Sequence, residues 1–319
     1  MTPVNPTIGI DIGGTKIAGG LIAPDGEILR RARRESPAQD VDRLADSVAD
    51  LITELSDGVE VERAGVACAG YIDKAGTTVL FSPNLAWRDE PLKERLERRV
   101  SVTVTIENDA NAAAYGEFKH GAGIGVDDMV MLTIGTGIGG AIIIGGRLFR
   151  GSYGIAAEVG HMRVVPDGIR CGCGNRGCLE SYGSGTALVR AARALVAGAS
   201  PYGATLRERC GGNADRLEGK HVTQAAEDGD PAAVELLADL GRWIGEGAAS
   251  MAAIVDPARF VVGGGVADAG DLLLEPIREG YARQLTGRGH RPVATFEAAR
   301  LGNDAGMVGA AALVRTEQR

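Results

Sequence analysis

Ile8-GIDIGGTKIAGGLIAPDGEIL (residues 8–29) and Val130-MLTIGTGIGGAIIIGGRLFRG (residues 130–151) share one pattern. In each stretch an apolar segment leads through a turn containing Gly and Thr into a second apolar segment, and a further Gly turn leads into a third. Short apolar, β-branched segments bounded by glycines are typical of strands. Because the same strand–turn–strand unit occurs twice, we predict two similar α/β lobes.

The rest of the chain alternates between helical and strand patterns. Apolar residues recur at helical spacing over residues 40–57, 186–196 and 231–255, and Pro231 and Pro257 bracket the last segment. Shorter helices are expected over 91–99, from Asp109, from Leu272 and from about Asp304, and strands near 64–67, 100–107, 260–262 and from Val293. This alternation predicts the α/β class with mixed sheets.

Composition excludes several classes of protein. The 319 residues are 45% hydrophobic and 24% charged, as in globular proteins, and the net charge of −8 disfavours nucleic-acid binding. The N-terminus shows no signal-peptide pattern, and no segment approaches the roughly 20 apolar residues that span a membrane. We therefore expect no nucleic-acid or membrane partner and a cytoplasmic location.

The glycine motifs do not fit the two familiar nucleotide loops. Gly135-Thr-Gly-Ile-Gly-Gly140 has the spacing G-x-G-x-x-G, but β-branched residues 141–144 follow it where a dinucleotide-binding motif requires a helix. Residues 9–16 resemble a Walker loop, but Thr15 stands where that loop needs Lys, and a strand follows again. Both motifs are therefore expected in strand–turn–strand units.

Such turns can still bind phosphate, because successive glycine N–H groups can converge on an anion. The candidate nucleotide-binding residues are Gly13, Gly14, Thr15 and Lys16 in the first turn and Thr136 and Gly137 in the second, with Asp11 placed to hold a metal ion through water. The alternative is that these are ordinary hairpin turns in Gly-rich strands, which would be preferred for one such turn, but two similar turns favour a nucleotide. The run Gly263, Gly264 and Gly265 is either a helix entry or a surface for adenosine.

The segment Glu107-Asn-Asp-Ala-Asn111 follows an alternating strand and opens a helix. In α/β proteins, ligands usually bind where strands end. Asp109 is either a helix N-cap, which is a common use of Asp, or a general base that accepts a hydroxyl proton in phosphoryl transfer. In the second case, Asn108 can bind the same substrate.

Three of the five cysteines lie in one short segment, Cys171, Cys173 and Cys178, and His161 precedes them. Three thiolates and an imidazole suit a closed, structural zinc site, with free thiols as the alternative. Glu158 and Glu180 flank the segment. Ionised carboxylates accept hydrogen bonds in pairs, which suits the paired hydroxyls of a sugar.

Together these motifs resemble the ROK family of sugar kinases and repressors. The resemblance rests on Asp11-Ile-Gly-Gly-Thr-Lys16, Asn84-Leu-Ala-Trp87, Glu107-Asn-Asp-Ala-Asn111, Thr133-Ile-Gly-Thr-Gly-Ile-Gly-Gly140, Glu158-Val-Gly-His161 and the cysteine segment through Glu180. It implies an actin-like (ribonuclease H-like) ATPase fold with a cleft between two α/β lobes. We expect the lobes at residues 1–110 with 305–319 and at 111–304.

The resemblance also implies an activity, ATP-dependent phosphorylation of D-glucose at the 6-hydroxyl, with Mg²⁺ and with Asp109 as the general base. It implies that the sugar is bound by Gly70, Asn84, Asn108, Asp109, Glu158, His161 and Glu180. It implies a structural Zn²⁺ held by His161, Cys171, Cys173 and Cys178. Members of the family are commonly homodimers or homotetramers.

Several alternatives stay open at this point. The sugar can be mannose, fructose or N-acetylmannosamine, and the phosphoryl donor can be polyphosphate. A sugar-responsive repressor would need a DNA-binding module, for which the seven residues before Ile8 leave no room. We therefore expect an enzyme.

Overall fold

A computed structural model describes residues 5–83 and 85–316 of the chain. The chain forms two compact units, which are described separately. Unit 1 takes its residues from Met1–Asp127, Ala141–Ala157 and Ala299–Arg319, and unit 2 from Asp128–Gly140 and Glu158–Ala298. The lobe limits expected from the sequence, at residues 110 and 304, differ from these ranges and remain a prediction.

The first sheet, in unit 1, has five strands in the order β3-β2-β1-β4-β8. These are β1 (Thr7–Ile12), β2 (Lys16–Ile22), β3 (Ile28–Glu35), β4 (Arg63–Cys68) and β8 (Thr103–Asn108). β2 pairs antiparallel with β1 and β3, whereas β4 runs parallel to β1 and β8 runs parallel to β4. The parallel ends of β1, β4 and β8 therefore meet at one edge of the sheet.

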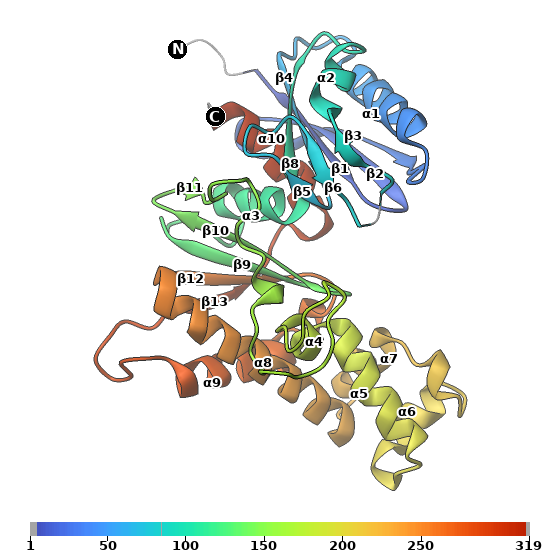
Figure 1. The fold of residues 1–319 in the computed structure, drawn as a ribbon, viewed down its shortest axis with the longest axis vertical. Helices are drawn as coiled ribbons and strands as arrows, with labels where there is room; N and C mark the ends of the chain where they lie inside the picture. The colour runs from blue at the N-terminus through green and yellow to red at the C-terminus, as the bar shows by residue number, and fades with distance from the viewer. Residues whose placement is uncertain (1–4, 84, 317–319) are drawn as a thin grey trace. The chain divides into compact units, whose positions relative to one another are not determined.

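Helices cover both faces of this sheet (Figure 1). They are α1 (Val41–Ser56), α2 (Leu92–Glu97), α3 (Asp109–His120) and α10 (Ala305–Thr316). A Cβ on Gly19 would meet Leu51 of α1, whereas a Cβ on the next residue, Gly20, would meet Met307 of α10. Since adjacent residues of a strand point to opposite faces, α1 and α10 lie on opposite sides. Gly9 allows α10 to approach closely, because a Cβ there would lie 1.9 Å from the Met307 carbonyl oxygen.

A second, three-stranded sheet in unit 1 was not predicted. It consists of β5 (Tyr71–Ile72), β6 (Val79–Phe81) and β7 (Arg88–Glu90), paired antiparallel. Its strands are two or three residues long, too short for an alternating pattern to appear in the sequence. The turn before β6 is held by the Asp73 carboxylate, which accepts hydrogen bonds from the backbone N–H groups of Thr77 and Thr78 at 2.7 and 3.0 Å.

The remaining sheet has the order β11-β10-β9-β12-β13. Its strands are β9 (Met129–Ile134), β10 (Ile138–Ile144), β11 (Arg147–Leu148), β12 (Arg259–Gly263) and β13 (Thr295–Ala298). Within unit 2, β12 runs parallel to both β9 and β13. The helices of unit 2 are α4 (Glu180–Gly183), α5 (Gly185–Ala197), α6 (Ala204–Arg209), α7 (Gly219–Glu227), α8 (Pro231–Val255) and α9 (Asp271–Gln284).

The structure confirms the α/β class, the two strand–turn–strand units and the helices with the strongest periodicity. Helix α1 lies between Asp40, whose side chain accepts a hydrogen bond from the Arg43 N–H, and Asp57. Helix α8 begins at Pro231, and Asp230 caps it. The short helices α6 and α7 were not predicted. Within residues 5–83 and 85–316, none of the helices combines the length and the apolar character that crossing a bilayer requires.

Candidate functional site

In unit 1, three predicted residues meet at the edge where parallel strands end. Asp11 is next to last in β1, and Ile12 pairs with Cys68, the last residue of β4. Cys68 in turn pairs with Asn108, the last residue of β8, and Asp109 follows as the first residue of α3. The two carboxylates are close enough for the charge of Asp109 to affect the titration of Asp11.

The carboxylate of Asp109 is fixed by hydrogen bonds and shielded from solvent. Its Oδ1 accepts hydrogen bonds from the Ala110 N–H at 2.9 Å and from the Asn108 side-chain amide at 3.1 Å. Burial raises the pKa of Asp109 above its usual value, and the hydrogen bonds from Ala110 and Asn108 oppose that rise. A raised pKa makes the carboxylate a better proton acceptor at neutral pH.

The N-cap interpretation of Asp109 is wrong. Asn108 caps α3, because its side-chain oxygen accepts a hydrogen bond from the Asn111 N–H at 3.0 Å. The Asn108 amide also donates to the Gly70 carbonyl oxygen at 3.0 Å. Gly70 has a φ of +131°, and a Cβ there would lie 2.2 Å from the Phe81 carbonyl oxygen, so only glycine fits. Asn84, the other predicted sugar-binding residue of this unit, lies outside the described residues.

The first glycine turn joins β1 to β2 beside Asp11. The Gly13 N–H donates to the Lys16 carbonyl oxygen at 2.9 Å, which closes the turn and leaves Gly14, Thr15 and Lys16 exposed. The first turn of α10 lies against Asp11, since a Cβ on Gly306 would come within 2.9 Å of its Oδ2. Burial and the charge of Asp109 raise the pKa of Asp11 to about 6, although Lys16 lowers it. Such a carboxylate fits a site that holds a cation.

We expect Asp11→Asn to stabilise the metal-free protein at pH 7.5. The folded-state pKa of about 6 lies above the ordinary aspartate value of 3.8, so folding favours the protonated acid, and stability is lost as pH rises from about 4 to 6. Above pH 6, the variant should gain about 1–3 kcal/mol in the free energy of unfolding, and the gain should vanish near pH 4. Urea unfolding at both pH values measures this. The control is Asp50→Asn, at an exposed position of α1, and equal effects of the two substitutions would contradict the account.

In unit 2, the second glycine turn packs against the start of α5. The Gly135 carbonyl oxygen accepts hydrogen bonds from the Gly185 N–H at 2.8 Å, and the Thr186 hydroxyl donates to the Thr136 carbonyl oxygen at 2.7 Å. The Ser184 side chain caps α5. The positive end of this 13-residue helix therefore lies beside the turn, an arrangement that suits an anion.

A cavity of about 960 Å³ opens at this turn. Two of the predicted nucleotide-binding segments line it, through Thr136 and Gly265. Gly264 has a φ of +87°, and a Cβ there would lie 2.5 Å from the Ile134 carbonyl oxygen, so the end of β12 can approach β9 only with glycine at this position. Gly263, the last residue of β12, pairs with Thr133.

Most of the cavity wall was missed by sequence reasoning. It includes Gly185, Thr186, Leu188, Val189, Arg190, Arg193, Leu217, Glu218, Gly219, Lys220, Thr223, Val266 and Asp268. The wall combines apolar side chains from α5 and from the segment after Gly265 with hydroxyl groups and charged side chains, a combination that suits a nucleobase and a ribose. The helix-capping pattern Ser184-Gly-Thr186 at the start of α5 was the one feature of the sequence that could have pointed to this cavity wall.

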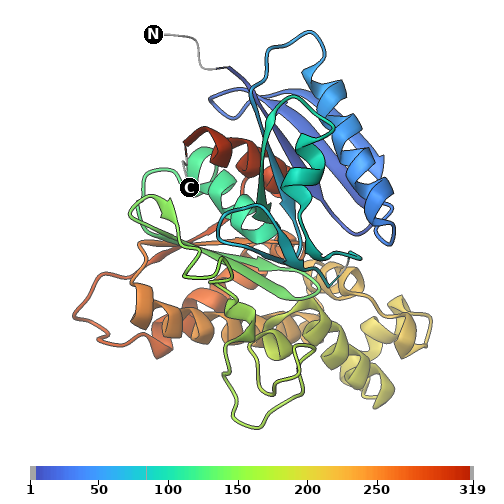
Figure 2. The ribbon, with the colours of Figure 1, turned by 45° about the horizontal axis from the view of Figure 1, so that its top comes forward.

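The four predicted metal ligands come together in unit 2. His161, Cys171, Cys173 and Cys178 place one ligand atom each within 4.8 Å of one another. Cys173 is exposed, whereas Cys171 and Cys178 are buried. The segment that carries them is a long irregular loop ahead of α4, drawn in yellow-green in Figure 2. A donor set of three sulfurs and one imidazole fits zinc.

The thiols are crowded enough to favour a cation. Burial and the neighbouring thiols of Cys173 and Cys171 raise the pKa of Cys178 to about 12. A hydrogen bond from the Asn175 backbone lowers the pKa of Cys173. Nδ1 of His161 lies 3.6 Å from the Cys171 sulfur, while Nε2 lies 4.0 Å from a Glu158 carboxylate oxygen. One ring nitrogen therefore faces the cluster and the other faces a predicted sugar-binding residue.

Glu180 connects this cluster with the second glycine turn. Its Oε2 accepts a hydrogen bond from the Ile138 N–H at 3.0 Å, and its Oε1 lies 3.8 Å from the Cys171 sulfur. Gly137 makes this approach possible, because a Cβ there would lie 2.2 Å from Oε2. Within unit 2, Glu158 therefore lies beside His161, His161 and Glu180 both lie beside Cys171, and Glu180 reaches Gly137.

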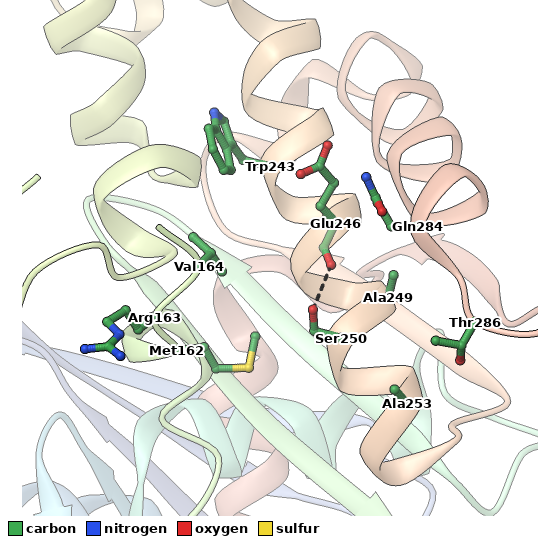
Figure 3. A pocket seen from close by; sticks show the side chains of 10 residues that line it. All are labelled: Met162, Arg163, Val164, Trp243, Glu246, Ala249, Ser250, Ala253, Gln284 and Thr286. Atoms are coloured by element: carbon green, nitrogen blue, oxygen red, sulfur yellow. Dashed lines mark hydrogen bonds between the residues drawn. The ribbon is translucent and has the colours of Figure 1, made fainter. Parts of the chain in front are cut away.

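A separate cavity of about 580 Å³ lies over α8 (Figure 3). Its lining consists of Met162, Arg163, Val164, Trp243, Glu246, Ala249, Ser250, Ala253, Gln284 and Thr286. None of these is a predicted site residue. The candidate functional residues of unit 1 are therefore the strand-end carboxylates and the first glycine turn, and those of unit 2 are the second glycine turn, the cavity beside it and the metal cluster.

Known proteins resemble this chain over nearly its whole length. A family model described as ROK family matches residues 7–317. The chain is 49% identical over 310 residues to a glucokinase of Streptomyces coelicolor, covering 97% of each chain, and 38% identical over 315 residues to a glucokinase of Thermotoga maritima, covering 97% of this chain and 96% of that one. A crystal structure of a ROK family glucokinase from Streptomyces griseus, in complex with glucose and AMPPNP, matches with a TM-score of 0.85 and 50% identity over 98% of this chain and all of that one.

Proposed function

This chain belongs to the ROK family, and we propose from that premise that it is an ATP-dependent glucokinase, which transfers a phosphoryl group to the 6-hydroxyl of D-glucose. The observation that carries the proposal is the 50% identity, over nearly the whole chain, to a solved ROK glucokinase bound to glucose and an ATP analogue.

We propose Asp109 as the general base. Its carboxylate accepts the proton of the 6-hydroxyl as the hydroxyl oxygen attacks the γ-phosphorus and the bond to the ADP oxygen breaks. The Asn108 amide and the Ala110 N–H fix the carboxylate, so that little reorganisation is needed. Burial raises the pKa of Asp109, which favours proton acceptance.

ATP is the proposed donor, with its adenosine in the cavity beside Thr136 and Gly265. The turn Gly13–Lys16 and the turn at Thr136 and Gly137 offer N–H groups and hydroxyls to the phosphates. Asp11 suits a Mg²⁺ ion held through water, and that ion would neutralise charge on the phosphates. Because ATP is the donor, we expect the reaction to take place in the cytoplasm.

The sugar-binding residues are proposed to be Gly70, Asn84, Asn108, Glu158, His161 and Glu180, together with Asp109. Zinc held by His161, Cys171, Cys173 and Cys178 would fix the tautomer and orientation of the His161 ring. The free ring nitrogen and the two glutamates then present hydrogen-bonding groups to sugar hydroxyls. In this proposal zinc is structural. We further propose a homodimer or homotetramer, which sedimentation velocity can test.

Glucose is expected to give the highest kcat/KM among hexoses. The test is ADP release, measured with ATP and Mg²⁺ across glucose, mannose, fructose and N-acetylmannosamine, with 6-deoxyglucose as the control that lacks the acceptor hydroxyl. A site that hydrogen-bonds particular hydroxyls should discriminate by tenfold or more, since each lost hydrogen bond costs about 1–3 kcal/mol. A higher kcat/KM for another hexose would identify that hexose as the preferred substrate. ADP release with 6-deoxyglucose as fast as with glucose would reject phosphoryl transfer to the 6-hydroxyl.

A further inference from the structure

A buried ion pair lies directly behind the proposed base. Glu107 is 3% exposed and precedes Asn108 and Asp109 in the chain. Its Oε2 accepts a hydrogen bond from Nε of Arg150 at 2.8 Å, and the side chains of the pair are 4% and 13% exposed. Sequence reasoning included Glu107 only as part of a motif and gave no role to Arg150.

The second oxygen of Glu107 holds the start of α3. Its Oε1 accepts hydrogen bonds from the Asn108 N–H at 3.0 Å and from the Asn111 side-chain amide at 3.1 Å. Asn108 in turn donates to Asp109 and to Gly70. One carboxylate therefore fixes the strand end from which both the base and a sugar-binding amide project.

Arg150 brings a loop into the same network. The loop follows β11 and closes on itself, since the Ala156 N–H donates to the Arg150 carbonyl oxygen at 3.2 Å. It packs on the turn after β5, where a Cβ on Gly154 would lie 2.4 Å from the Ile72 carbonyl oxygen. The segment of unit 1 that contains this loop ends at Ala157, and the predicted sugar-binding residue Glu158 follows in the chain.

We propose that Arg150 is a positioning residue for phosphoryl transfer: by pairing with Glu107, it fixes the Asn108–Asp109 corner and ties that corner to the loop that leads to Glu158. This inference rests on the proposed function. A buried carboxylate without a cationic partner is strongly disfavoured, so loss of Arg150 would leave Glu107 to move or to find another partner. A shift of the base by about 1 Å is enough to slow catalysis by roughly 100-fold.

The test compares Arg150→Met with Arg147→Met, which removes an exposed arginine three residues earlier in the same hairpin. We expect Arg150→Met to lower kcat/KM for glucose by about 10–100-fold and to leave the KM for ATP unchanged, because the proposed adenosine cavity includes neither Arg150 nor Glu107. Arg150→Lys keeps the charge without the guanidinium geometry and should restore part of the activity. If Arg150→Met does not fold, Arg150→Lys and Glu107→Gln are each compared with Arg147→Met instead.

The double variant Glu107→Gln/Arg150→Met separates positioning from general damage. If Arg150 acts through Glu107, the double variant should lose no more kcat than the worse single variant. The inference is overturned if the losses multiply, if kcat/KM for glucose in Arg150→Met is within twofold of that in Arg147→Met, or if the KM for ATP changes as much as that for glucose. Failure of the proposed function can be told apart from failure of this inference, because the wild-type protein would then phosphorylate no hexose.

Discussion

Asp109→Asn is expected to lower kcat by roughly 10³-fold, the middle to upper range for loss of a general base. Asparagine keeps the shape of the side chain and can still accept a hydrogen bond from the Ala110 N–H, but it cannot take the proton of the attacking hydroxyl. Glucose binding should change by no more than a few fold, because the other proposed sugar contacts remain. Steady-state kinetics for kcat and tryptophan fluorescence or calorimetry for glucose binding measure the two effects.

The matched control for this prediction is Asp50→Asn, which removes an exposed carboxylate of α1 far along the chain from any proposed site residue. It should leave kcat unchanged. The pH profile gives a second check, since wild-type activity should fall as pH drops towards the pKa of about 6 of Asp11 and the raised pKa of Asp109. A near-normal kcat in Asp109→Asn would reject the assignment of the base.

Cys173→Ala is expected to abolish zinc binding and, with it, glucose phosphorylation. Cys173 is exposed, so the substitution removes a ligand without opening a cavity in the core. Structural zinc sites bind their ion with an apparent free energy of about 10–16 kcal/mol, and loss of one thiolate removes much of it. Without the ion, nothing fixes the His161 ring, so glucose binding should weaken more than ATP binding.

Elemental analysis of the purified protein measures this directly, with about one zinc per chain expected for the wild type. Cys210→Ala is the control, because Cys210 is a thiol outside the cluster. It should keep both its zinc and its activity. A wild-type protein without stoichiometric zinc, or a Cys173→Ala variant that retains it, would contradict the metal assignment.

Local motifs predicted the parts of the site that depend on a few neighbouring residues. The two glycine turns, the strand end before Asp109 and the His161–Cys178 ligand set all follow from residue type and spacing. Coordinates were needed to tell which residue caps α3, because Asn108 and Asp109 are both good N-caps. The hydrogen bond from the Asn111 N–H to the Asn108 side chain identifies Asn108 as the cap, while the role of Asp109 as a base remains a proposal.

Contacts between distant segments could not be predicted from a single sequence. Glu180 was expected to bind sugar, yet its hydrogen bond to the Ile138 N–H joins residues 42 positions apart. The hydrogen bond between Arg150 and Glu107 likewise joins residues 43 positions apart. Lys220 and Thr223 of α7 line the proposed adenosine cavity, and no sequence motif marks that helix. These contacts are set by how the sheets and helices pack, which periodicity does not encode.

The most direct test of the central claim is the identity of the product. The wild-type protein is incubated with glucose, ATP and Mg²⁺, and glucose 6-phosphate is measured with glucose-6-phosphate dehydrogenase while ADP release is followed in parallel. The account predicts one glucose 6-phosphate for each ADP, at a kcat within the usual range of about 1–10³ s⁻¹. Release of ADP without glucose 6-phosphate, or no release at all with glucose, would contradict it.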